Sequence, residues 1–397
     1  MNNIIASVMP QEGGLAASPS RSYNAIITVG GLLAAVGLAA GLHAMLIGHE
    51  HAYGVTREVP WGLLIAAYVF FVVTSTGLCL VSAIGHVFGV EAFKPIAKRS
   101  VFLAIITIIA GFFVIAFEIE NPWRMPIYNM LSPNPTSNIW WMGTLYGAYL
   151  FFMVVEFALL QLEKHKVAGI FGLLGLVAGI AAHSNLGAVF GLLGGREFWH
   201  GPYMPIYFIT SAMMSGCAAV IFFHWVGYKA NGWKMSEKLE ASLCSTAKLG
   251  ATLIAVIMFF TTWKMISGIS GQPPGKYEAM MSLINGPYAV NFWVGEVMLG
   301  MVVPFILILS ARAKNLPVLF SASVSGIIGI FFMRYDLVVV GQIVPHFHGM
   351  GINELPHLFT YTPSLHEIMI TVGAVGLTVM GFLMGERLFR GHLSEDH

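Results

Sequence analysis

The strongest constraint on this chain is a series of apolar runs, each long enough to cross a lipid bilayer. A hydrocarbon core of about 30 Å needs about 20 helical residues. We place such runs at 24–48, 60–86, 100–118, 139–160, 167–190, 203–226, 246–267, 288–311, 317–342 and 365–387. Only 10% of the 397 residues are charged, against about 25% in a soluble domain. The sequence therefore predicts an all-α integral membrane protein of about ten transmembrane helices.

The predicted membrane domain spans 24–387, between an N-terminal segment at 1–23 and a tail at 388–397. The first residues are polar and lack a basic stretch leading into a short apolar core, so we expect no cleaved signal peptide. Cys79, Cys217 and Cys244 show no CxxC spacing, which argues against a disulfide framework, an iron–sulfur cluster or a zinc site. We expect this chain to be embedded in the lipid bilayer and to bind no nucleic acid.

Loop charges predict the orientation, because cytoplasmic loops carry an excess of Lys and Arg. One side of the predicted bundle holds Arg21, Lys94, Lys98, Arg99, Lys164, Lys166, Lys229, Lys234, Lys238, Lys248, Arg312, Lys314, Arg387 and Arg390. The other side holds only Arg57, Arg124, Arg196 and Lys276. Both termini should therefore be cytoplasmic, in a multi-pass protein of the bacterial inner membrane.

The outer loops are long and rich in Pro, Trp, His and Gly, whereas the inner ones are short and basic. Long ordered loops usually dock another molecule. The candidates for partner docking are Trp123, Trp199, His200, His346 and His348. Every predicted helix that runs inward from this face begins next to a proline, which is either ordinary capping or a way to aim positive helix ends at a ligand oxygen.

Ionisable residues within the predicted spans gather in the outer half. A charge near the bilayer centre costs about 2.5–3.5 kcal/mol, so such residues usually face a cavity or one another. The outer group comprises His43, Glu118, His183, Lys264, Glu296, Arg334, Asp336 and Glu367, and only Glu156 is placed in the inner half. The outer group forms either a polar site or structural pairs such as Arg334 with Asp336 or Glu296. For Glu156 we prefer structural pairing to an inward proton route.

Histidine placement bears on two cofactors. His43 and His183 lie at similar predicted depths, but no helix carries the spaced histidine pair that stacks two haems, so we expect no haem in this chain. His346, His348 and His357 share a Gly-rich loop, which is a weak signal for a metal site, and we assign none.

Several short stretches, in order along the chain, resemble the NrfD/PsrC family of membrane subunits, and ten spans resemble its HybB/DsrP/Hmc-like branch. The stretches are Val59-Pro60-Trp61-Gly62, Asn121-Pro122-Trp123-Arg124, Ser137-Asn138-Ile139-Trp140-Trp141, His183-Ser184-Asn185-Leu186, Phe198-Trp199-His200, Gly295-Glu296 with Pro304, and Gly341-Gln342. The resemblance implies two four-helix bundles, spans 2–5 and 6–9, flanked by extra helices.

The resemblance also implies a non-autonomous subunit of a respiratory oxidoreductase, with a menaquinone or ubiquinone site near the periplasmic face. Its implied partners are a periplasmic, ferredoxin-like iron–sulfur subunit and further catalytic or cytochrome subunits. Members of the family generally bind no haem. Sulfur compounds are one substrate class that remains open for the complex, and the direction of electron flow is open too.

A quinol needs hydrogen-bond partners for its oxygens, acceptors for two protons and an apolar slot. We expect His183 and Glu296 as proton acceptors and Trp61 and Tyr68 in the slot. The remaining candidate quinone-binding residues are Glu118, Arg124, Arg334 and Asp336. Two other functions stay open: a secondary transporter or ion or proton channel, for which buried charges are equally typical, and a purely structural anchor.

Overall fold

The computed structural model describes residues 20–346 and 356–389, and within them ten helices are long and apolar enough to cross a membrane. They are α2 (Arg21–Ile47), α4 (Leu63–His86), α5 (Lys94–Glu118), α7 (Asn138–Gln161), α8 (His165–Gly191), α9 (Tyr203–Asn231), α10 (Glu237–Ile269), the π-helix η2 (Asn291–Val302) continued by α12 (Val303–Ser310), α13 (Leu316–Val340) and α14 (Leu365–Phe389). The predicted all-α membrane fold is confirmed.

The short elements lie in the connections between spans. They are α3 (His49–Ala52), η1 (Glu91–Phe93), α6 (Arg124–Leu131) and α11 (Lys276–Ile284). The largest boundary difference is at α10, which begins at Glu237 and not near 246. The Ser236 side chain accepts a hydrogen bond from the Leu239 N–H, and Glu237 and Glu240 occupy the first turn, so this end is capped in the usual way. Hydropathy detected only the apolar part of the helix.

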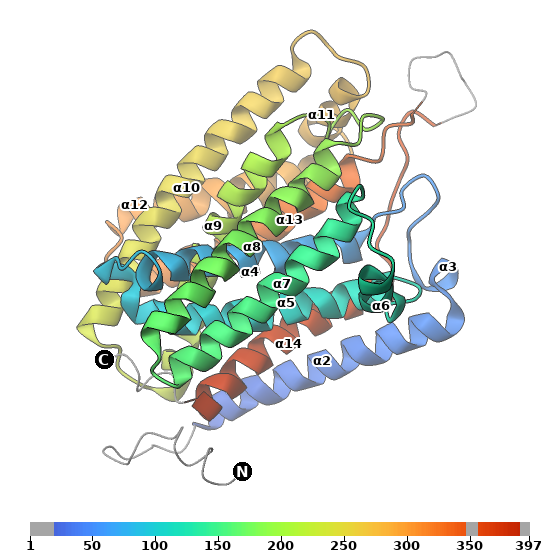
Figure 1. The fold of residues 1–397 in the computed structure, drawn as a ribbon. Helices are drawn as coiled ribbons and strands as arrows, with labels where there is room; N and C mark the ends of the chain where they lie inside the picture. Colours follow the sequence, from blue (N-terminus) through green and yellow to red (C-terminus); the bar gives the residue numbers. More distant parts are fainter. Residues whose placement is uncertain (1–19, 347–355, 390–397) are drawn as a thin grey trace.

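The helices pack as two four-helix bundles and one helix pair (Figure 1). The first bundle contains α4, α5, α7 and α8, and the second contains α9, α10, η2 with α12, and α13. Helices α2 and α14 lie side by side and rest on α5. They are antiparallel, because the Tyr23 hydroxyl near the start of α2 donates to the Leu383 carbonyl near the end of α14, at 2.6 Å.

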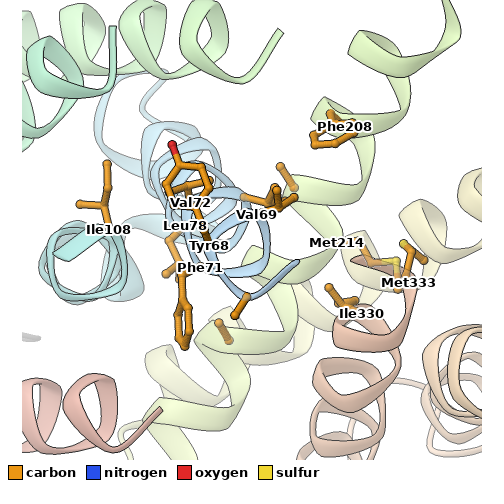
Figure 2. Close-up of a cluster of buried hydrophobic side chains, with 14 of the residues drawn as sticks. Tyr68, Val69, Phe71, Val72, Leu78, Ile108, Phe208, Met214, Ile330 and Met333 are labelled. Atoms are coloured by element: carbon orange, nitrogen blue, oxygen red, sulfur yellow. The ribbon is translucent and has the colours of Figure 1, made fainter. Parts of the chain in front are cut away.

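The two bundles meet where α4 crosses α9. A Cβ atom at Gly77 would fall on the Ala212 carbonyl, and one at Gly216 would fall on the Gly77 backbone. Only glycine permits this approach, which is the usual way in which small residues bring membrane helices together. The same α4 contributes Tyr68, Val69, Phe71, Val72 and Leu78 to the buried core in Figure 2. Helix α4 is thus the central element of the fold.

Charged residues are buried on the inner side as well, so the expectation that Glu156 stands there alone is wrong. Arg99 on α5 and Glu386 on α14 form a buried ion pair. Hydropathy placed Arg99 in a loop, because it directly precedes the apolar run that begins at residue 100. Glu156 itself is paired, since its Oε1 lies 3.0 Å from the His86 Nδ1.

Candidate functional site

A cavity of about 780 Å³ opens at the end of the first bundle that the loop charges predict to be the outer one. It lies between the start of α4, the end of α5, α7 and α8, with α6 against it. We call it the outer cavity. Its wall is mostly apolar, and the polar or aromatic residues in the wall are Trp61, Tyr68, Glu120, Asn121, Arg124, Tyr128, Asn129, Ser132, Ser137, Trp140 and Phe190. Its size and lining suit a planar ring with an apolar tail.

Three of the predicted quinone-binding residues line the outer cavity: Trp61, Tyr68 and Arg124. Tyr68 projects from α4 and is otherwise buried. Arg124 begins α6 and is exposed, and it forms no ion pair with any described residue. The Arg124 guanidinium is therefore a hydrogen-bond donor that keeps its charge at every physiological pH. The rest of the cavity wall is mostly apolar.

Trp61 forms part of that wall together with two other rings. Its indole stacks on Trp199, with centroids 5.4 Å apart and planes at 30°, and meets Phe190 edge-on at 5.4 Å. Trp199 is 2% exposed, so the prediction that it contacts a partner protein is wrong for this structure. The Trp199 indole has an apolar ring and a polar N–H. Both make their contacts inside the protein, the ring with Trp61 and the N–H with the Leu337 carbonyl.

His183 lies behind the outer cavity and does not line it. Its Nε2 is 3.2 Å from the Phe208 carbonyl, and its Nδ1 is 3.3 Å from the Tyr146 hydroxyl. Because a carbonyl only accepts, Nε2 carries the proton in the neutral ring, and Nδ1 accepts from the tyrosine. Tyr68, which lines the cavity, lies near Tyr146. The Tyr146 hydroxyl is therefore the polar group that stands between His183 and the side of the first bundle that holds the cavity.

The other charged candidates lie together in the second bundle. Glu296, Arg334 and Asp336 are buried, and Lys264 is half-buried. We call these four residues the buried charged cluster. The Arg334 Nη2 donates to the Ser211 hydroxyl at 2.6 Å. No ion pair within 4.0 Å joins Arg334 to an acid in the described part of the chain, so the direct pairing considered above is absent. Glu296 interacts electrostatically with both Lys264 and Arg334. The cluster does not line the outer cavity.

Two members of this cluster keep polar atoms without hydrogen bonds. Within the described residues, Arg334 Nε and Nη1 and both Asp336 carboxylate oxygens have no partner. Arg334 is fully buried and Asp336 is 1% exposed. Such groups are rare in native structures and are typical of functional sites. Glu296 moreover lies on a π-helix, a backbone form that is frequent at functional sites.

Glu118 lies near Glu367, and its side chain does not line the outer cavity, although Ile119 and Glu120 beside it in the chain do. The Glu367 carboxylate accepts hydrogen bonds from the Tyr361 hydroxyl at 2.5 Å, the Ser364 N–H at 2.8 Å and the Gly54 N–H at 2.9 Å. Burial and then the neighbouring Glu367 raise the pKa of Tyr361 above its ordinary value. The Glu367 carboxyl group is therefore well supplied with hydrogen-bond donors, and through the Gly54 N–H it holds the loop before α4 in place.

The remaining docking candidates differ in exposure. Trp123 is 62% exposed, and His200 and His346 are also on the surface. His346 lines a second, more polar cavity of about 330 Å³ with Gly195 and Arg196, whereas His348 lies outside the described residues.

The two histidines considered for haem ligation do not face each other. His43 stacks on His366, with Nδ1 and Nε2 2.9 Å apart, while His183 contacts Phe208. The described residues contain no group of three or more potential metal ligands.

Sequence reasoning missed Tyr146, whose hydroxyl contacts the His183 Nδ1. A signal for it exists, because Tyr146, Tyr149, Met153 and Glu156 recur every three or four residues and form the buried stripe of α7. Polar residues at helical spacing in an otherwise apolar span indicate the face that points away from lipid. Gln342 belongs to the Gly341-Gln342 stretch that resembles the family, but this resemblance assigned it no role, and Arg196 leaves no comparable pattern.

Comparison with known proteins gives one family and several relatives. The profile of the family described as "Polysulphide reductase, NrfD" matches residues 51–346. A selenate reductase subunit from Mesobacillus selenatarsenatis is 26% identical, over 82% of this chain and 85% of its own. The Hdr-like menaquinol oxidoreductase integral membrane subunit of Archaeoglobus fulgidus is 27% identical, over 93% and 94%. The menaquinone reductase integral membrane subunit of Nitratidesulfovibrio vulgaris is 22% identical, over 74% and 75%.

Proposed function

The chain belongs to the NrfD family, and from this premise we propose that it is the membrane subunit of a quinone-linked oxidoreductase complex. In this complex it exchanges electrons and protons with menaquinone or ubiquinone at the outer cavity. It passes the electrons to or from an iron–sulfur subunit at the periplasmic face. Two relatives carry menaquinol or menaquinone in their names, which supports a quinone as the small-molecule partner.

The observation that carries the proposal is the outer cavity itself. Its 780 Å³ would hold a bicyclic or monocyclic headgroup, since ligand pockets are typically about 300–1,000 Å³. Ile65, Val69 and Leu186 supply an apolar wall, and Trp61 a flat aromatic one. Arg124 and Tyr68 supply hydrogen-bond donors for the two oxygens. A quinone needs these three features together.

Proton transfer uses the residues behind the wall. A quinol that gives up two electrons also gives up two protons. Tyr68 lines the cavity, and the Tyr146 hydroxyl near it contacts the His183 Nδ1. His183 takes up the first proton transiently by way of these hydroxyls, since its burial and the nearby Arg334 oppose a lasting positive charge on the ring. Arg334 also lies near Glu296. Glu296 is then the second acceptor, reached through the buried charged cluster and not by contact with the quinone.

Electrons must leave the chain, because its side chains cannot store two of them. The outer face offers Trp123, His200 and His346 for a ferredoxin-like protein, with catalytic or cytochrome subunits beyond it. The charge distribution of the loops supports an inner-membrane protein with both termini in the cytoplasm. Glu156 has no part in this scheme, and its contact with the His86 Nδ1 at 3.0 Å supports a structural role for it.

The test is to fill the outer cavity. In Ile65→Trp a bulky ring projects into the space, so the purified complex should retain less than about a tenth of the wild-type bound quinone, because each 1.4 kcal/mol of lost affinity is tenfold. The matched control is Ile266→Trp, which fills an apolar groove between α10 and η2 in the second bundle. Quinone content is measured by solvent extraction and chromatography. Equal quinone content in both variants would contradict the proposal.

A further inference from the structure

The Trp61 wall of the outer cavity is fixed by a residue from the other bundle. Gln342 lies just after the end of α13 and is 1% exposed. Its Oε1 accepts a hydrogen bond from the Trp61 N–H at 3.0 Å, and its Nε2 donates to the Trp61 carbonyl at 2.9 Å. The Nε2 also donates to the Val338 carbonyl at 2.7 Å. One carboxamide therefore pairs with both main-chain polar groups of Trp61.

The last turn of α13 also seats the ring that stacks on Trp61. The Trp199 Nε1 donates to the Leu337 carbonyl at 2.6 Å. A Cβ atom at Gly341 would fall inside the Trp199 indole, so glycine is required at that position. The end of α13 thus positions both tryptophans. It holds Trp61 by main-chain hydrogen bonds, and it holds Trp199 by the hydrogen bond to Nε1 and by close packing of the indole on Gly341.

Arg196 joins this arrangement to two loops. Its Nη1 donates to the Gln342 carbonyl at 2.8 Å and to the Val344 carbonyl at 3.2 Å, and its Nη2 donates to the Glu58 carbonyl at 3.2 Å. The segment before α4, the loop between α8 and α9 and the end of α13 are therefore tied at one point. Each hydrogen bond from a charged group is stronger than a neutral one.

We infer that Gln342 is a positioning residue for quinone binding that acts through Trp61, an inference that rests on the proposed function. Trp61 immediately precedes the Gly62 cap of α4, where no helical hydrogen bond restrains it. Gln342 supplies that restraint from the second bundle, so the indole keeps the orientation at which a flat quinone ring lies against it. Without the carboxamide, the N–H and the carbonyl of the half-buried Trp61 would both lose their partners, and we expect this loss to move the chain.

The test is a double-mutant cycle on the purified complex, with a short-tailed naphthoquinone as the probe and isothermal titration calorimetry as the readout. Gln342→Leu should raise Kd about tenfold, because the Trp61 main chain loses both of its Gln342 partners and the indole leaves the orientation that the quinone ring needs. In a Trp61→Ala background the same substitution should raise Kd less than about threefold, because coupled residues are not additive. A merely structural role for Gln342 would give the same rise in both backgrounds.

The matched control is Gln161→Leu at the inner end of α7, which should leave Kd unchanged. If Gln342→Leu fails to assemble, Gln342→Glu replaces it, because the carboxylate still accepts from the Trp61 N–H but cannot donate to the Trp61 carbonyl. An unchanged Kd in the single variant, or equal rises in both backgrounds, would overturn the role of Gln342. A wild-type complex without saturable binding would instead overturn the proposed function.

Discussion

At the scale of single residues, buried acids in this protein differ in how fully they are hydrogen-bonded. Glu367 accepts three hydrogen bonds and closes a loop, whereas Asp336 has both carboxylate oxygens unpaired within the described residues. A satisfied acid stabilises a fold, and an unsatisfied one is retained for another reason. We therefore assign the first to structure and the second, with Glu296 beside it, to chemistry.

Glu296→Gln tests this assignment. The amide keeps the shape of the side chain but cannot take up a proton, so quinone-linked turnover should fall by roughly 10²–10⁴-fold while the complex still assembles. Turnover and subunit stoichiometry are measured on the same preparation, with the exposed Glu58→Gln as the control. Full turnover in an intact complex would remove Glu296 from the mechanism, and loss of the complex would make it a structural charge.

Tyr361→Phe tests the structural role of Glu367. The substitution removes one hydrogen bond to the carboxylate and leaves the Leu63 N–H without its acceptor, so the free energy of unfolding should fall by about 1–3 kcal/mol.

The cost should not depend on pH between 6 and 9. The folded-state pKa of Tyr361 is raised above its ordinary value of 10.0 by burial and by Glu367. The stabilisation is therefore complete below pH 10 and is lost only as the pH rises through the folded-state pKa. A cost that changes steeply between pH 6 and 9, in chemical denaturation of the purified protein, would contradict this.

The sequence predicts some site residues better than others. Tyr68 and His183 stand out because polar groups in a lipid-crossing helix must face inward. Depth alone predicted that Glu296 and His183 contact one quinone, but depth does not define the angle around each helix. In the structure both residues lie near Arg334, and of the predicted quinone-binding residues only Trp61, Tyr68 and Arg124 reach the outer cavity.

At the scale of helices, the contact of α4 with α9 depends on glycine. Gly77→Ala should destabilise the protein by about 3 kcal/mol, because its Cβ atom has no space beside Ala212 and an overpacked contact must shift backbone. Gly147→Ala on α7 is the control, since nothing lies within 4 Å of that position. Thermal unfolding of both variants in detergent gives the comparison, and equal stability would show that the bundles can separate freely.

Helices α5 and α14 depend on an ion pair. Arg99→Gln leaves Glu386 as a buried charge without its main partner, so the free energy of unfolding should fall by about 3–5 kcal/mol. Lys94→Gln breaks the neighbouring but exposed pair with Glu91 and should cost less than about 1 kcal/mol. Equal effects of the two substitutions would mean that the Arg99 pair is solvated.

Helix positions were predictable and short outer helices were not. A span needs about 20 apolar residues, which leaves a plain signal in hydropathy. Helices α6 and α11 have eight and nine residues, and no residue of α6 is buried, so neither shows a span-like pattern. Their positions follow from the spans that they connect.

At the scale of the whole molecule, orientation follows from loop charge. In a variant without native cysteines, Met130→Cys on α6 should react with an impermeant maleimide in intact spheroplasts, because Met130 is 84% exposed on the predicted outer side. Lys166→Cys on the opposite side should react only after permeabilisation. The reverse pattern would place the termini outside.

The two-bundle architecture came from family resemblance, and the packing of α4 to α8 and of α9 to α13 agrees with it. Composition and hydropathy could not have supplied it, because they give the number of spans but not which spans touch. The placement of the cavity in the first bundle and of the charged cluster in the second depends on side-chain packing between distant segments.

Photoaffinity labelling shows where quinone binds, and we expect it to mark the outer cavity. The purified complex is illuminated with an azido-naphthoquinone, and labelled peptides are identified by mass spectrometry. We expect the label on residues of α4, α6 or α7 such as Tyr68, Met125 and Trp140. Excess menaquinone or ubiquinone should reduce this labelling. Competed label found only in the groove between α10 and η2, at Met258 or Trp293, would contradict it.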